Sequence, residues 1–237
     1  AFPRFVAEAV LPGFSAFTRD DALRGGRSLL ERGAVRVKLG TGIAGLGQWV
    51  AADLDELEAV IAAIDEREIT ESGVVIELNL VDVATQSVGQ ICAAGLAASY
   101  CGRQRLTTNN EGVEVYGGSE LKVVRGGFDD LLEIELPEEM RVAIAQARVY
   151  DDAAHACFHG FFASRRNYDV AQGADASGQW RSGVLEQSWR MGGASGAEIA
   201  ALEAFRADPS LRAVDACSRE VYGNGARVPD GADIYFR

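Results

Sequence analysis

A lysine at the end of a short strand pattern is followed by a glycine-rich run, and this combination could bind phosphate. Lys38 lies near the end of Ala34–Leu39, where apolar and basic residues alternate, and Gly42, Gly45 and Gly47 follow. Glycines let backbone N–H groups approach phosphate oxygens, and a lysine ammonium offsets the phosphate charge. The run lacks the Lys and Ser/Thr that end a P-loop. The alternative is a tight glycine hairpin between two strands, with Lys38 solvated.

Two polar strand patterns in the last third of the chain could hold a metal ion. Asp169 lies in the first, residues 164–170, and Glu186 in the second, residues 182–190, with a glycine-bearing turn between them. On adjacent strands these two carboxylates could share magnesium with phosphate oxygens, which are the hard ligands that this ion prefers. The alternative is an exposed hairpin whose acids pair with nearby arginines.

The helices and strands that carry these residues can be predicted from the spacing of apolar residues and from helix-capping residues. We expect helices over residues 19–32, from 53 onward, over 137–156 and over 197–207, and further strands over 48–51, 74–80, 87–94 and 114–116. Pro137 and the two glutamates after it suit the N-terminal end of a long helix. We expect a boundary between two lobes after Leu80.

Composition narrows the function classes. The formal net charge of −12 argues against a broad surface for nucleic acid. Apolar stretches are too short to cross a bilayer, and the four scattered cysteines predict reduced thiols in a cytoplasmic protein. The chain begins without an initiator Met or a signal peptide, which predicts a piece of a longer protein.

Taken together, the two constellations resemble the ATP-grasp superfamily, from about Phe17 through Arg190. The resemblance implies an α+β chain with the ATP-grasp fold, in which two α/β lobes with antiparallel sheets clasp a nucleotide cleft. Residues 1–80 would form the small lobe with the glycine loop. Residues 81–237 would form the larger lobe with the metal-binding strands.

The same resemblance assigns nucleotide contacts on the first lobe and near its end. Lys38 would contact the α- or β-phosphate, and Gly42–Gly47 would close over the phosphates. Glu77 would face the adenine amino group, with the backbone of Leu78–Leu80 at the adenine edge. Gln86 stands near the position where many relatives use an acid on the ribose.

The resemblance also assigns metal ligands and cationic residues on the second lobe. Asp169 and Glu186 would hold Mg²⁺. The sequence departs from the usual Glu-x-Asn, because Ser188 stands where the family uses Asn, so a hydroxyl would replace the amide oxygen as ligand. Arg166 and Arg190 lie where the family often places positive charge against the transferred phosphoryl group.

More narrowly, several runs are similar to a bacterial family catalogued only as a domain of unknown function. They are Thr85–Gln90, Val115–Ser119, Arg165–Val170 and Leu185–Ser195. Members of that family carry additional sequence before and after this chain. The absent N-terminal part would correspond to the first lobe of an ATP-grasp enzyme.

The resemblance predicts ATP and Mg²⁺ as cofactors and an ATP-dependent carboxylate–amine or carboxylate–thiol ligase that acts through an acyl-phosphate. The partners would be ATP and a small carboxylate or amine substrate, with no nucleic acid and no membrane, and a homodimer is left open. The alternative is a nucleotide-binding or regulatory module of the same fold that does not catalyse turnover of ATP. The serine at position 188 in place of the usual Asn and the absent N-terminal lobe are the reasons for this alternative. A third alternative is a purely structural domain.

Overall fold

The computed structural model describes residues 1–42, 47–223, 227 and 230–234, and it divides into two compact units. The first unit comprises residues 1–84 and 171–183, and the second comprises residues 85–170 and 184–237. The sequence predicted a single boundary after Leu80. In the structure, residues 171–183, which connect the two polar strands predicted in the last third of the chain, also belong to the first unit.

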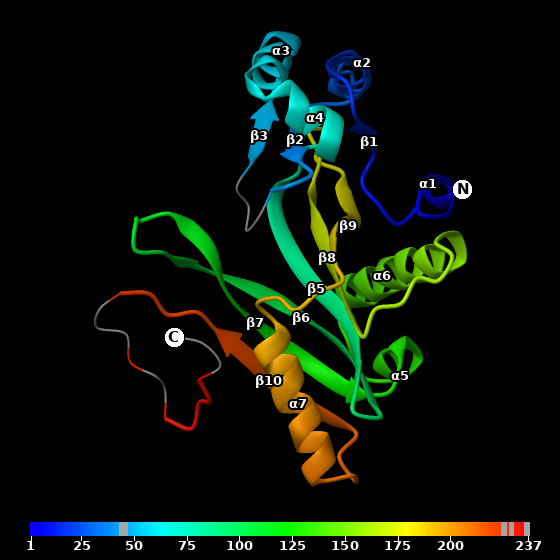
Figure 1. Cartoon of the computed structure of the whole chain (residues 1–237), viewed down its shortest axis with the longest axis vertical. Coiled ribbons are helices and arrows are strands. Elements are labelled where there is room, and N and C mark those ends of the chain that lie inside the picture. The colour runs from blue at the N-terminus through cyan, green and yellow to red at the C-terminus, as the bar shows by residue number, and fades with distance from the viewer. Residues whose placement is uncertain (43–46, 224–226, 228–229, 235–237) are drawn as a thin grey trace. The chain divides into compact units, whose positions relative to one another are not determined.

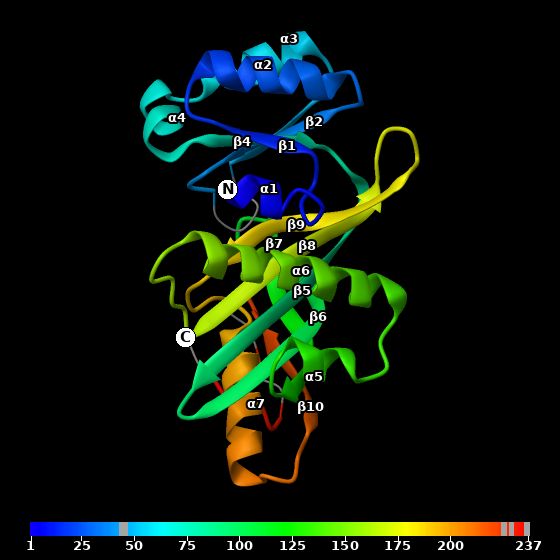
Figure 2. The same ribbon diagram turned by 90° about the vertical axis from the view of Figure 1, so that its right-hand side faces the viewer.

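The first unit contains a four-stranded antiparallel sheet in the order β1-β4-β2-β3. Its elements are α1 (Phe2–Phe5), β1 (Gly13–Ala16), α2 (Arg19–Leu30), β2 (Val35–Leu39), β3 (Gln48–Ala51), α3 (Leu54–Ala63), α4 (Glu66–Ser72) and β4 (Val74–Leu78). Helices α2 and α3 lie over one face of this sheet (Figure 2).

Side-chain caps begin the helices α2, α3 and α4 of the first unit. Thr18 accepts a hydrogen bond from the backbone N–H of Asp21 at the start of α2, and Asp53 accepts one from Glu56 at the start of α3. The apolar faces of these helices pack on Val35, Val37 and Ile76, among others, to form the core. Because side chains alternate along a strand, the polar residues of β2 and β4 lie on the opposite face.

The second sheet has six strands in the order β10-β7-β6-β5-β8-β9. The elements are β5 (Val81–Ala93), β6 (Leu96–Thr108), β7 (Glu114–Arg125), α5 (Phe128–Leu132), α6 (Glu138–Cys157), β8 (Arg165–Ala174), β9 (Trp180–Ser188), α7 (Ser195–Ala207) and β10 (Ala213–Arg219). Strands β5, β8 and β9 carry residues of both units. Figure 1 shows the order of these elements along the chain.

Within the second unit, α6 and α7 cover opposite faces of the sheet (Figure 1, Figure 2). Buried residues of α7, including Ala197, Ala201 and Phe205, pack on Tyr100 and Val123. The face of the sheet that α7 covers is called the α7 face below, and the opposite face is called the α6 face. Of the helices that the structure describes, none combines the length and the apolar character needed to cross a bilayer.

Candidate functional site

The polar face of the first unit holds a nearly buried ion pair between two predicted site residues. The Nζ atom of Lys38 lies 2.7 Å from Oε1 of Glu77, and their side chains are 12% and 8% exposed. Strand register explains the pairing, because Lys38 is the partner of Val75 in β4, and Glu77 follows two residues later on the same face. Arg36 lies on this face too and donates to Oδ1 of Asn79 at 2.8 Å.

The segment predicted to line the adenine edge follows directly after this pair. Leu78 and Leu80 are both buried. The backbone N–H of Leu78 donates to the carbonyl oxygen of Pro12 at 3.0 Å, and that of Asn79 donates to Ala34 at 2.9 Å. The local backbone is therefore held in place by neighbouring chain segments.

The ends of the predicted glycine loop are held by backbone hydrogen bonds. Gly42 donates its N–H to the carbonyl oxygen of Leu39 at 3.1 Å, and Leu39 donates its own to Gly47 at 3.0 Å. The predicted site residue Gly45 lies outside the described residues. The loop therefore starts and ends beside the strand that carries Lys38.

In the second unit, the predicted metal ligand Asp169 lies in a hydrogen-bonded group on the α7 face. Its Oδ1 atom accepts a hydrogen bond from Nδ2 of Asn167 at 2.8 Å and a longer one from the Ser87 hydroxyl at 3.4 Å. The Tyr100 hydroxyl donates to Oδ1 of Asn167 at 2.8 Å. Burial raises the pKa of Asp169 above its ordinary value, against the opposing effect of hydrogen bonds from Asn167, Gln104 and Ser87.

The other two predicted metal ligands lie on the same face. Arg165 of β8 donates from Nη1 to the Ser188 hydroxyl at 3.1 Å, which places Ser188 on the face shared by Arg165 and Asp169. Glu186 stands two residues before Ser188 in β9, so it shares that face, and its side chain is exposed. The three predicted oxygen ligands therefore lie on one side of the sheet.

Arg166 and Gln86 point to the α6 face instead. The Nε atom of Arg166 lies 2.7 Å from Oδ1 of Asp151 in α6. Gln86 is fully buried and alternates with Ser87 along β5, whose register with β6 is regular there. Arg190 follows β9, is exposed, and donates from Nη1 to the carbonyl oxygen of Met191 at 2.8 Å.

Sequence reasoning missed the polar residues on the α7 face that form a chain of hydrogen bonds from Asp169 to α7. Arg165 was not selected, although it adjoins Arg166, and strand alternation sends neighbouring side chains to opposite faces. Glu198 of α7, whose Oε1 atom lies 2.8 Å from Nη2 of Arg165, was missed because a single acid in an amphipathic helix carries no signal of burial. Asn167 offered one usable signal, since it stands two residues before Asp169 and therefore shares its face.

The chemistry of the oxygen donors suits Mg²⁺. This ion usually keeps several waters and binds through one or two carboxylates together with phosphate oxygens, so two acids are sufficient. Within the described part of the chain, no three His, Cys, Asp or Glu side chains form a metal-binding group. The oxygen donors on the α7 face that could hold the ion together with a nucleotide are Asp169, Glu186 and Ser188, and the Ser188 hydroxyl also accepts from Arg165.

Comparison with solved structures shows the fold of the chain. The biotin carboxylase domain of 2-oxoglutarate carboxylase from Hydrogenobacter thermophilus, in complex with MgADP and bicarbonate, matches with a TM-score of 0.52 and 14% identity, over 81% of this chain and 38% of that one. The fold is the ATP-grasp fold, with mixed α/β structure and antiparallel sheets, as the sequence predicted. The chain belongs to the family described as "Protein of unknown function (DUF3182)", whose model matches residues 1–237.

Two further solved structures are similar at lower scores. N5-carboxyaminoimidazole synthetase from Staphylococcus aureus, complexed with ADP, has a TM-score of 0.49 and 15% identity, over 84% of this chain and 45% of that one. The L-amino acid ligase from Bacillus licheniformis has a TM-score of 0.45 and 19% identity, over 81% and 39%. The chain thus spans less than half the length of these three proteins. No curated protein sequence matches it.

Proposed function

We propose that this chain binds Mg-ATP. One observation carries the proposal: within the ATP-grasp fold, Lys38 and Glu77 form a nearly buried pair on the face of the small sheet that α2 and α3 do not cover. A buried ion pair contributes little net stability compared with apolar residues of similar volume. A nucleotide would give each member a new partner, because an adenine amino group donates to a carboxylate and a phosphate accepts from an ammonium.

The metal would be held on the second unit by Asp169, Glu186 and Ser188. When bound, Mg²⁺ offsets negative charge on the phosphates and orients them. Asp169 is half-buried on the same face of the sheet as Ser188, and a partly desolvated carboxylate is a stronger electrostatic partner for a cation than an exposed one. Gln86, which faces the other side of the sheet, is proposed as a ribose contact by family resemblance alone.

We propose an ATP-dependent ligase of the carboxylate–amine or carboxylate–thiol class. A carboxylate oxygen would attack the γ-phosphorus of ATP and release ADP, and an amine or thiol would then displace phosphate from the acyl-phosphate. Lys38 and the amides of the glycine loop would offset phosphate charge, and Arg190 would stabilise the transferred phosphoryl group. Arg166 is proposed for the same role by family resemblance, although its guanidinium is paired with Asp151.

A second function is favoured by the contacts of Ser188. Its hydroxyl accepts from the cationic Arg165, so the third metal ligand is weaker than the usual amide oxygen and stands beside a positive charge. Such a site could retain nucleotide binding and lose turnover. The chain would then be a non-catalytic nucleotide-binding or regulatory module.

Calorimetric titration of ATP into the 237-residue chain, with and without Mg²⁺, tests the binding proposal. We expect binding that Mg²⁺ strengthens, and weaker binding after Lys38→Ala or Glu186→Ala with the fold unchanged by circular dichroism. If both variants bind as tightly as the parent chain, the site assignment is wrong. Release of ADP on addition of candidate carboxylic acids, measured on the full-length protein, separates the ligase from the non-catalytic module.

A further inference from the structure

The end of β9, which carries two predicted metal ligands, is fixed by one arginine on the α7 face. From Nη1, Arg165 donates to the Ser188 carbonyl oxygen at 3.2 Å, to the Ser188 hydroxyl at 3.1 Å and to the Arg190 carbonyl oxygen at 2.7 Å. A single guanidinium thus holds both the last residue of β9 and the chain beyond it. Its planar fork sets the geometry of these bonds, which a lysine ammonium would not reproduce.

Glu198 of α7 holds that arginine in turn. Both carboxylate oxygens of Glu198 lie 3.1 Å from Nε of Arg165, and Oε1 lies 2.8 Å from its Nη2. The two side chains are 5% and 0% exposed. Burial alone would lower the pKa of Arg165, but the hydrogen bonds and charge of Glu198 raise it, so the guanidinium stays charged.

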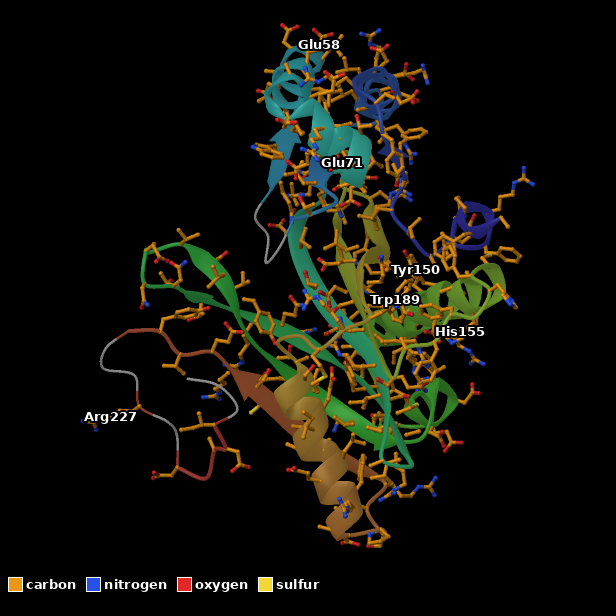
Figure 3. All side chains as sticks on the ribbon, viewed as in Figure 1. Glu58, Glu71, Tyr150, His155, Trp189 and Arg227 are labelled. Atoms are coloured by element: carbon orange, nitrogen blue, oxygen red, sulfur yellow. The ribbon has the colours of Figure 1, made fainter. Side chains whose placement is uncertain are left out.

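Trp189, the residue after β9, is held from the α6 face by hydrogen bonds that involve Tyr168. Trp189 donates from Nε1 to the Tyr168 hydroxyl at 3.1 Å, and Tyr168 donates to Oδ1 of Asp151 at 2.6 Å. The ring of Tyr150 in α6, which Figure 3 labels together with Trp189, lies 5.5 Å from the ring of Tyr168. Consecutive residues Ser188 and Trp189 are therefore anchored on opposite faces of the sheet.

We propose that Arg165, clamped by Glu198, is a positioning residue that sets where Glu186 and Ser188 present their oxygen atoms to a metal ion. The inference rests on the proposed function. Stability alone does not explain the pair, because well-packed apolar residues of similar volume usually stabilise a core as well or better. Arg165 touches no nucleotide in this proposal and acts only through the placement of Ser188–Arg190.

Arg165→Lys in the 237-residue chain tests the proposal. We expect Mg²⁺-free ATP binding to be retained, while the factor by which Mg²⁺ strengthens ATP binding falls at least about tenfold, as for residues that orient metal ligands elsewhere. Hydrogen exchange at the amides of residues 188–195 should become faster. A merely structural role would weaken binding with and without Mg²⁺ alike.

Arg125→Lys is the matched control. Arg125 also donates its guanidinium N–H groups to backbone carbonyl oxygens, those of Phe205 and Leu211, at the far end of α7. This variant loses bonds of the same kind but touches neither β9 nor Ser188. Its Mg²⁺ dependence should equal that of the parent chain.

The outcomes separate the two proposals. If the parent chain shows Mg²⁺-dependent binding and Arg165→Lys keeps all of it, the positioning role is overturned and the proposed function stands. If the parent chain shows no such binding, the proposed function fails, and the positioning role fails with it. Should Arg165→Lys not fold, the double variant R165Q/E198Q leaves no unpaired buried charge, and it should show the same loss of Mg²⁺ dependence.

Discussion

At the scale of single residues, the burial of the Lys38–Glu77 pair predicts how the free energy of unfolding changes when the pair is broken, in the absence of any ligand. Lys38→Met leaves a carboxylate nearly buried and unpaired, and we expect a loss of about 3 kcal/mol in the free energy of unfolding. Adding Glu77→Leu should restore most of it, because the pair would then be replaced by apolar side chains. Urea denaturation of the single and double variants measures both steps.

The control for this pair is the lysine of β7. Lys122 forms an ion pair with Asp215 at 3.0 Å, but both side chains are well exposed. Lys122→Met should therefore change the free energy of unfolding by less than about 1 kcal/mol. Equal losses for Lys38→Met and Lys122→Met would contradict the buried character of the first pair.

A buried thiol provides a second test at this scale. Burial raises the pKa of Cys101 to about 12, so the reactive thiolate is scarce at neutral pH. At pH 8 in the native protein, iodoacetamide should modify the exposed Cys92 and Cys217 well before Cys101, as mass spectrometry of the peptides would show. Modification of Cys101 at the same rate would mean that this part of the sheet opens readily.

The same shift makes stability depend on pH. The Cys101 thiol keeps its proton to higher pH in the folded chain than in the unfolded chain. Its contribution to the free energy of unfolding is therefore complete below the ordinary thiol pKa, and it is lost as the pH rises toward 12. Cys101→Val should therefore reduce the fall in unfolding free energy between pH 8 and pH 10. Denaturant titrations at the two pH values compare the variant with the parent chain.

At the scale of elements, the pairing of β6 with β7 depends on the absence of a side chain at Gly102. A Cβ atom there would lie 1.8 Å from the carbonyl oxygen of Glu120, which is backbone and cannot move aside. We expect Gly102→Ala to cost about 3 kcal/mol or more in the free energy of unfolding. Gly127→Ala is the matched control, because a Cβ atom there would meet nothing closer than 3.6 Å. Thermal melts of both variants should show a far smaller loss of unfolding free energy for Gly127→Ala.

The sequence predicted the elements that have strong local signals. The helix expected over 19–32 is α2, because Thr18 caps it and acids occupy its first turn, and the helices over 137–156 and 197–207 correspond to α6 and α7. The strand β6, by contrast, was missed. Its residues include Gly102 and two arginines, and its stability comes from pairing with β5 and β7, which no local pattern reveals.

The candidate site was predictable in its residue types and less so in its geometry. Register explains why Lys38 meets Glu77, but that register depends on which strands are neighbours, and sequence periodicity does not give it. In β8, alternation predicts that the adjacent arginines face opposite sides of the sheet, but which of them meets Ser188 depends on the neighbouring strand. Arg165, which contacts Ser188, emerged only from the structure.

At the scale of the whole molecule, ligand binding should raise the thermal stability of the chain. A ligand that binds only the folded state adds about 2.7 kcal/mol at a free concentration one hundred times its Kd. We therefore expect Mg-ATP to raise the melting temperature by several degrees, with a smaller rise for ATP and EDTA. Mg-GTP is the control for base selectivity, and equal shifts for both nucleotides would argue against an adenine contact at Glu77.

The division of the chain has a consequence for how the protein could be dissected or recombined. The first unit needs residues 171–183, which come after most of the second unit has been passed, so the polypeptide crosses between the units three times. Neither unit corresponds to one uninterrupted stretch of gene, and no single cut of the chain isolates either of them from the other. Exchange between homologues by a single crossover within residues 85–170 would therefore give the first unit residues 1–84 from one parent and residues 171–183 from the other.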